Sequence, residues 1–150
     1  MPPALLDTNI LVDAAYRQAP LHAAAAHLVD RGLRERGRFC IAPQNLVEFA
    51  AVVSRPRFVD PPLSSSEIVR IVHTLYRSRQ LVKIYPQRAT VMRAIREGAH
   101  LGITGPLWYD LFLALTMQDA GVSIIITHDT DHFRRFPFVV ARGVDQAGVL

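Results

Sequence analysis

The order of apolar and polar positions along the chain predicts short strands that alternate with longer helices. Short apolar segments predict five strands, at residues 4–7, 38–42, 81–85, 123–127 and 139–141. Apolar residues at helical spacing predict six helices, at residues 10–16, 21–36, 43–54, 64–77, 89–100 and 104–120. Because strands and helices alternate, the pattern predicts an α/β sandwich with a mainly parallel sheet.

Local signals support several of these elements. Pro43 suits the first position of the helix that follows the second strand. Ser64 and Glu67 have the spacing of a capping box, which predicts a helix start. Residues 123–127 form a continuous apolar and β-branched run, typical of a strand buried on both faces of a parallel sheet. In the helix at residues 21–36, the side chains expected to face the core are Ala24, Leu28 and Leu33.

Length and composition indicate one globular domain over residues 1–150. Half of the residues are hydrophobic and 20% are charged, which is ordinary for a folded protein. The apolar segments are too short to cross a bilayer, and the first residues lack the basic and apolar parts of a signal peptide. We therefore expect no membrane association and a cytoplasmic location. Cys40 is the one cysteine, and its predicted strand suits a buried apolar role.

The charge balance favours a polyanionic partner only slightly. The formal net charge is +4, and of 17 basic residues only Lys83 is a lysine. Arginine binds phosphate with a planar fork of donors, which suits nucleic acid. An arginine-rich composition is equally the product of a G+C-rich genome, so charge alone does not identify the partner.

Three acidic residues are expected at one edge of the predicted sheet. Asp7 ends the first strand, and Asp129 follows the strand at residues 123–127. Glu48 lies in the opening turns of the helix that directly follows the second strand. Functional residues of such folds gather where the carboxyl ends of parallel strands meet. Each acid alone also fits a structural role, as a helix cap or as a partner of a helix dipole.

Carboxylates held this close repel one another, at a cost of about 4 kcal/mol per pair at ~4 Å. Protonation or a bound cation relieves the repulsion, and ligands that are all oxygen select Mg²⁺ or Mn²⁺ over zinc. A cation of this kind facing a basic surface points to phosphoryl chemistry with an activated water. His128 and His132 flank Asp129 and raise the alternative of zinc, but we interpret them as exposed loop residues that contact phosphate.

Four ordered segments, each with an acid, resemble the PIN-domain nucleases and in particular their VapC-type toxins. They are LLDTNILVD at residues 5–13, NLVEF at 45–49, WYDLFLA at 108–114 and IITHDTDHF at 125–133. The resemblance spans nearly the whole chain. It implies a three-layer sandwich with a five-stranded parallel sheet and metal-dependent cleavage of RNA.

The resemblance also implies a role for individual residues. Asp7 and Asp110 correspond to the principal ligands of Mg²⁺ or Mn²⁺, and Glu48 and Asp129 to the acids that complete the cluster. Asp110 follows no predicted strand, so only the resemblance places it in the site. The residues expected to assist are Asn9 and Thr127, which orient the cluster, and Asp131 as an accessory acid. Asp13 fits either the site or the surface of the first helix. Of Trp108 and Tyr109, we expect at least one to pack in the core. The other can stack a base, but neither is counted among the site residues.

The resemblance further implies a homodimer and a small antitoxin protein that covers the acidic pocket. Two alternatives keep the fold: a PIN nuclease of RNA processing with no antitoxin, and a non-catalytic module that docks RNA or protein. The presence of all four acids favours catalysis. A phosphoryl receiver domain also has an acid at a strand end, but it needs a lysine late in the chain, where this sequence has none.

Overall fold

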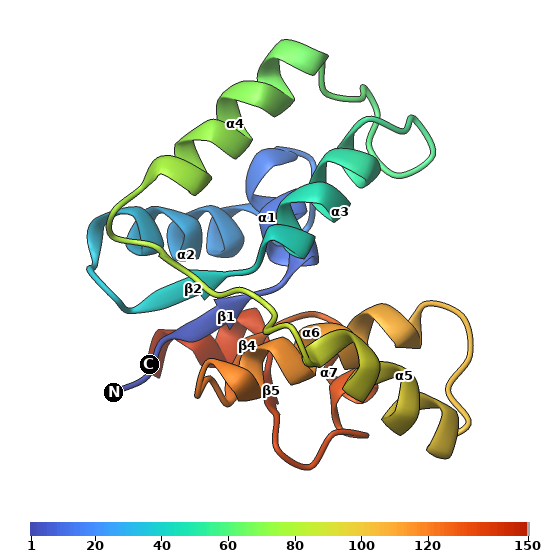
Figure 1. Ribbon diagram of the computed structural model, residues 1–150. Helices are drawn as coiled ribbons and strands as arrows, with labels where there is room; N and C mark the ends of the chain where they lie inside the picture. Colours follow the sequence, from blue (N-terminus) through green and yellow to red (C-terminus); the bar gives the residue numbers. More distant parts are fainter. Residues whose placement is uncertain (150) are drawn as a thin grey trace.

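One parallel sheet forms the middle layer of the computed structural model, which describes residues 1–149 (Figure 1). Its strands are β1 (Ala4–Leu6), β2 (Phe39–Ile41), β3 (Val82–Lys83), β4 (Ile124–Ile126) and β5 (Val140–Arg142). They lie in the order β3-β2-β1-β4-β5, and every pairing is parallel. The predicted five-stranded parallel sheet is confirmed. Strands β1 to β4 are shorter than the predicted segments, and β3 retains two of five predicted residues, whereas β5 has the predicted length and begins one residue later.

Helices cover both faces of this sheet. They are α1 (Thr8–Ala15), α2 (His22–Arg34), α3 (Pro43–Val53), α4 (Ser65–Arg77), α5 (Thr90–His100), α6 (Leu107–Asp119) and α7 (Thr130–Phe133), with a 3-10 helix, η1 (Val144–Val149). The six predicted helices are present, with ends that differ by no more than three residues. The sequence pattern missed α7 and η1, which are too short to show a helical period. No helix within residues 1–149 combines the length and the apolar character needed to cross a bilayer.

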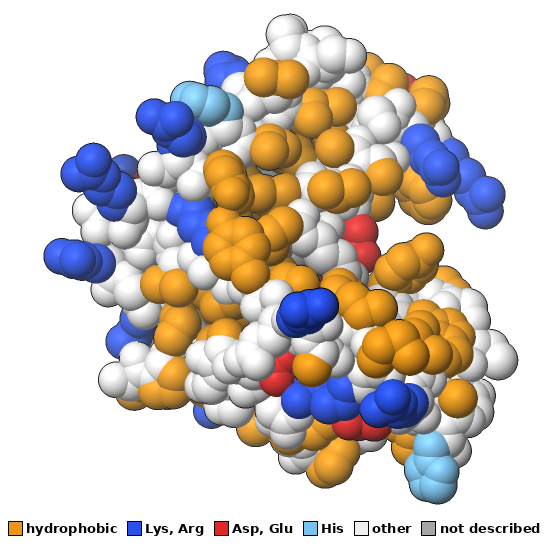
Figure 2. Space-filling model, in the orientation of Figure 1, with side chains coloured by type: hydrophobic (Ala, Val, Ile, Leu, Met, Phe, Trp, Pro, Cys, Tyr) orange, Lys and Arg blue, Asp and Glu red, His pale blue; other side chains and the backbone are white. Residues whose placement is uncertain are grey.

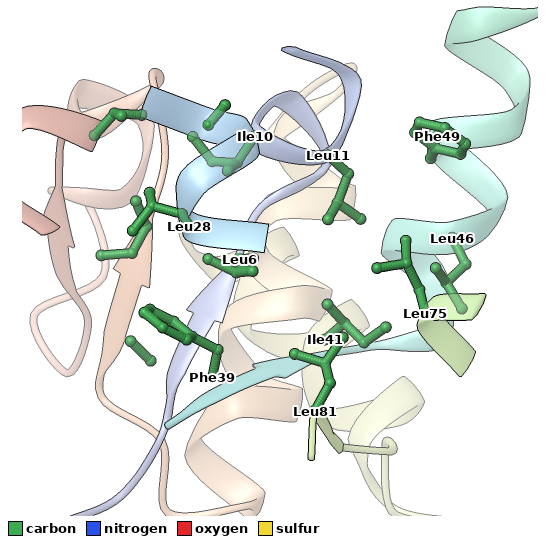
Figure 3. Packing of buried hydrophobic residues seen from close by; sticks show 14 of the residues in the cluster. Leu6, Ile10, Leu11, Leu28, Phe39, Ile41, Leu46, Phe49, Leu75 and Leu81 are labelled. Atoms are coloured by element: carbon green, nitrogen blue, oxygen red, sulfur yellow. The ribbon is translucent and has the colours of Figure 1, made fainter. Parts of the chain in front are cut away.

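Alternate residues of each strand face opposite layers, and this builds two separate cores. Leu6 and Ile41 pack with α1 to α4, and Figure 3 shows both side chains pointing toward residues of α2, α3 and α4. Leu5 and Cys40 point to the other face and pack with α5, α6 and α7. Because the central strands β1, β2 and β4 are covered by helices on both faces, the expected three-layer sandwich is confirmed.

The inward face of α2 differs from the predicted one by a single position. Ala25, Leu28 and Gly32 are buried, whereas Ala24 is exposed and Leu33 is only half-buried. Residues 25, 28 and 32 follow the i, i+3, i+7 spacing of one helix face, which passes beside Ala24. The prediction was wrong for Ala24 because several consecutive alanines leave the phase of the apolar stripe undefined.

Burial is most complete along α6. Its apolar residues are buried all round the helix, which is the pattern of a helix enclosed in a core. The polar residues at its two ends reach the surface: Tyr109 and Asp110 in the first turn and Gln118 in the last. The predicted apolar role of Cys40 is likewise confirmed, since the residue is wholly buried and burial raises the pKa of its thiol to about 12.

A close contact between α5 and α6 fixes where that first turn lies. The ring of Trp108 lies so close to Gly98 that a Cβ atom on Gly98 would stand 2.4 Å from ring atom Cζ3. Trp108 therefore takes the packing role expected for one of the two aromatic residues, and Tyr109 is 63% exposed.

Replacing Gly98 with alanine tests this contact. Alanine in place of glycine normally stabilises a helix by about 0.5–1 kcal/mol. Here we expect a loss of about 1–3 kcal/mol instead, because the added carbon forces Trp108 to move. Denaturant unfolding followed by the fluorescence of Trp108, the only tryptophan, measures the change.

Gly32→Ala is the milder comparison, since its nearest neighbour is the flexible tip of Leu81 at 3.3 Å. A stabilised Gly98→Ala variant would contradict the packing described here.

Candidate active site

The candidate site lies where the strand order of the sheet reverses. The chain passes from β1 to β2 on one side, while β4 lies on the other side of β1. In open parallel sheets this crevice, at the carboxyl ends of the strands, is the usual position of a ligand site. A pocket of about 220 Å³ opens there. Its lining residues are Asp7, Thr8, Asn9, Val12, Asp13, Glu48, Val52, Asp110 and Asp129.

The structure brings all four principal acids predicted from the sequence to this one pocket. Asp7 follows β1 and caps α1, and Glu48 lies in the second turn of α3. Asp110 lies in the first turn of α6, and Asp129 stands between β4 and α7. Figure 2 shows an acidic patch inside the notch between α3 and α6. Acids from both helical layers therefore meet above the edge of the sheet.

Asp7 is the most constrained of the four acids. Its Oδ1 accepts a hydrogen bond from the backbone N–H of Thr8 at 2.7 Å. Its Oδ2 accepts from the Thr127 hydroxyl at 2.7 Å and from the Asn9 amide at 3.2 Å. Three donors thus fix the orientation of a carboxylate that is almost completely buried.

The surroundings of Asp7 oppose its ionisation. Burial is the main cause that raises its pKa from 3.8 to about 6. The negative charges of Asp110 and Glu48 raise the pKa further, while the hydrogen bonds from Thr127 and Thr8 lower it. A carboxylate in this position is ready to bind a cation, because the cation would offset both the burial and the repulsion.

Asn9 and Thr127 contact the cluster as the resemblance implied. The Asn9 amide nitrogen lies 3.2 Å from Asp7 Oδ2, 3.0 Å from Thr127 Oγ1 and 3.3 Å from Asp129 Oδ2. The Asp129 backbone N–H also donates to Thr127 Oγ1 at 3.0 Å. This network joins the end of β1 to the end of β4, so the two aspartates share one scaffold.

Glu48 is held at both carboxylate oxygens by residues that sequence reasoning missed. The Thr8 hydroxyl donates to Oε2 at 2.9 Å, and the Gln44 amide donates to Oε1 at 2.9 Å. The Asn45 amide in turn donates to Thr8 Oγ1 at 3.2 Å. Thr8 and Asn45 stand inside the segments that resemble PIN nucleases, and Gln44 is one helical turn before Glu48. These positions in the sequence signal that the three residues lie near the site, but the atoms that they bond to depend on the fold.

Both histidines that flank Asp129 are exposed, as expected, and His128 lies in the loop after β4, but each contacts an acid of the pocket. His132 Nδ1 lies 3.2 Å from Asp110 Oδ2, on the short helix α7 that the sequence pattern missed. His128 Nε2 lies 2.7 Å from Asp13 Oδ2, so Asp13 belongs to the pocket and is not a detached surface acid. Both rings are partly exposed and border the acidic pocket from the β4 side.

Asp110 shares the electrostatic situation of Asp7 in a more open position. Its pKa is raised above the usual value, with burial as the main cause. The nearby charge of His132 lowers the pKa, and the charges of Asp129 and Glu48 raise it.

Asp131 stands apart from these residues. Its side chain is 83% exposed and pairs with Arg134 at 2.9 Å on the outer side of α7. The structure does not place it against the four acids, so its accessory role stays a prediction from the resemblance.

Comparison with known proteins decides the family. A family model described as PIN domain matches residues 4–139. The chain belongs to the PIN-domain family. Its expected VapC-type character is confirmed by ribonuclease VapC24 of Mycobacterium tuberculosis, which is 31% identical over 135 residues, covering 89% of this chain and 90% of VapC24.

Two solved structures show the same fold at low sequence identity. VapC20 of Mycobacterium tuberculosis, a sarcin–ricin-loop-cleaving toxin, is 11% identical to this PIN domain with a TM-score of 0.66, covering 89% of this chain and 95% of VapC20. DNA-bound VapBC from Salmonella typhimurium is 20% identical with a TM-score of 0.64, covering 96% and 99% of the two chains.

The acidic pocket of this PIN domain fits a partly hydrated hard cation. Its donors are carboxylate oxygens, the ligand type of Mg²⁺ and Mn²⁺. Within residues 1–149, no group of three or more His, Cys, Asp or Glu side chains stands close enough to enclose an ion directly. Mg²⁺ usually keeps several waters and takes only one or two protein carboxylates, so a pocket wider than a closed cage suits it.

The buried charge of Asp7 predicts a pH-dependent stability difference. The pKa is higher in the folded chain, about 6, than the ordinary value of 3.8, so the folded state loses stability as the pH rises from about 4 through 6. Asp7→Asn removes this charge. In EDTA, we expect the variant to gain about 3 kcal/mol relative to the wild type between pH 4 and pH 8. Urea unfolding at both pH values measures the gain.

Asp30→Asn is the matched control, since Asp30 lies half-exposed on α2 and pairs with Arg34. An equal gain in both variants would contradict the assignment of the effect to Asp7.

Proposed function

We propose that this PIN domain is an endoribonuclease that depends on Mg²⁺ or Mn²⁺ and acts as the toxin of a toxin–antitoxin pair. The observation that carries the proposal is the convergence of four carboxylates, from four separate elements, on one pocket at the switch point of the sheet. Clusters of acids with perturbed pKa values are far more often functional than incidental.

In this proposal Asp7 and Asp110 hold the ion, and Glu48 and Asp129 complete the cluster. When bound, such an ion activates water and stabilises the negative charge that develops on the phosphate. The chain contributes rigidity: three donors fix Asp7 and two fix Glu48. Asn9 keeps Asp7 and Asp129 at a constant separation. Preorganised groups of this kind lose little free energy to rearrangement during the reaction.

The surroundings of the pocket suit a single-stranded or looped RNA. The connection between α3 and α4 carries the exposed residues Arg55 and Arg57, and basic side chains border the notch in Figure 2. Tyr109 is exposed immediately before Asp110, where an aromatic ring can stack on an unpaired base. In this arrangement the arginine side chains bind RNA phosphates and the ring of Tyr109 stacks on a base. The RNA backbone between these two contacts then passes over the acids.

The comparisons support the substrate class and the partner. VapC24 is named a ribonuclease, and VapC20 is a sarcin–ricin-loop-cleaving toxin. The Salmonella typhimurium structure is a VapBC assembly on DNA. We therefore propose RNA as the substrate and a small antitoxin protein as the partner, with a homodimer as a further prediction from the resemblance. A short neighbouring reading frame for a DNA-binding protein distinguishes a toxin from a nuclease of RNA processing.

Cleavage of a structured RNA tests the proposal directly. We expect cleavage with Mg²⁺ or Mn²⁺ and none in EDTA. Asp7→Asn and Asp110→Asn should each lower kcat by about 100-fold or more, the scale expected when a preorganised electrostatic group is removed. Gel analysis of the RNA over time measures the rates, and Asp30→Asn should match the wild type.

Cleavage in EDTA, or full activity of Asp7→Asn, would reject the mechanism. RNA binding by the wild type without any cleavage would instead favour the non-catalytic docking module.

Salt dependence tests the proposed RNA surface separately. Phosphate contacts release counterions, so affinity should fall steeply as salt rises. With the non-cleaving Asp7→Asn background, we expect Arg55→Ala and Arg57→Ala each to reduce the slope of log K against log salt by about 0.7. Fluorescence anisotropy of a labelled RNA measures the slope. A flat salt response would contradict phosphate-dominated binding.

A further inference from the structure

Gln44 connects two helices that lie in different layers of the sandwich. It occupies the second position of α3, and its amide nitrogen lies 2.9 Å from Glu48 Oε1. The same nitrogen lies 3.1 Å from the backbone carbonyl oxygen of Tyr109, in the first turn of α6. Both partners are acceptors only. The amide nitrogen, and not the amide oxygen, must therefore face them.

The other end of the same side chain gains nothing from this arrangement. Gln44 Oε1 is buried and has no hydrogen-bond partner within the described part of the chain. A buried acceptor without a partner lowers stability, because it gives up water and receives no donor in return. An apolar side chain of equal length would avoid this cost. In the stability of the fold, the unpaired oxygen therefore offsets part of what the two hydrogen bonds of the nitrogen contribute.

The position of the bridge indicates a role besides stability. Helix α3 packs in the core of α1 to α4, and α6 packs in the core on the other face of the sheet. Glu48 and Asp110 thus belong to different layers, and the sheet does not fix the distance between them. Gln44 bonds to Glu48 itself and to the residue before Asp110. With Thr8 on Oε2, it leaves Glu48 little freedom to rotate.

We propose that Gln44 is a positioning residue, which holds Glu48 and the first turn of α6 at the separation that the acidic pocket needs. The inference rests on the proposed function of that pocket. Partners that orient metal-binding carboxylates typically contribute 10–100-fold to metal affinity or activity. In this role the amide nitrogen of Gln44 aligns the two acids, while its amide oxygen is left without a partner among the described residues.

Gln44→Met is the main test, since methionine has a similar length and no donor. We expect its thermal midpoint in EDTA to stay within about 3 °C of the wild type or to rise. We expect kcat for RNA cleavage to fall about tenfold or more, with KM unchanged. Affinity for Mn²⁺ alone, measured by titration calorimetry, should fall by a similar factor. A side chain that only stabilised the fold would lower the midpoint and leave kcat unchanged.

A second variant and a matched control complete the test. Gln44→Asn keeps the amide but is one methylene shorter, so it cannot reach both acceptors and should behave as Gln44→Met does. Gln118→Met changes an exposed glutamine on α6, which accepts from Arg93 at 3.3 Å, and should match the wild type in kcat and Mn²⁺ affinity.

The outcomes separate this inference from the proposed function. A wild type that neither cleaves RNA nor binds Mn²⁺ would overturn both. An active wild type with equally active Gln44 variants would overturn the inference alone. The same holds if both variants unfold more than about 10 °C below the wild type in EDTA, since Gln44 would then act on the fold.

Discussion

The ionised carboxylate of Asp7 at the end of the central strand is the constraint on which the rest of the site depends. Its position beside β4 and beneath α1 removes it from water, and burial raises its pKa. Such a charge is tolerated only when donors or a cation compensate for the lost hydration. Thr8 and Thr127 supply part of that compensation through hydrogen bonds. These hydrogen bonds leave part of the cost of burying the charge uncompensated. A bound cation would offset it, which makes the pocket a candidate cation site.

The two-layer arrangement explains how acids from distant segments reach the same place. Side chains alternate across each strand, so the cores on the two faces form independently. Helices from both layers then begin or pass near the edge where β1 and β4 end. Glu48 comes from one layer and Asp110 from the other, and hydrogen-bonded polar side chains join them across that edge. The cores set the fold, and the polar network sets the geometry of the pocket.

Sequence patterns predicted the part of the site that follows from chain connectivity. Asp7, Asp129 and Glu48 follow strands, so a parallel sheet brings them to one edge. Asp110 follows no strand, and only its resemblance to a known motif placed it there. The bonds of Thr8 and Gln44 were beyond prediction, because their partners depend on where the fold places α1, α3 and α6 relative to one another. The pairing of His132 with Asp110 was missed since α7 is too short to show a period.

Because Cys40 is wholly buried, the reactivity of its thiol reports how often the sheet opens locally around β2. The thiol lies in β2, between β1 and β3, and reagents in solvent cannot reach it while the sheet is intact. Alkylation then proceeds only as often as β2 separates from its neighbours. Because this is the sole thiol, the labelling rate reports one strand without mutation or added dye. The strand in question leads directly into α3, so the same rate describes the element that carries Glu48.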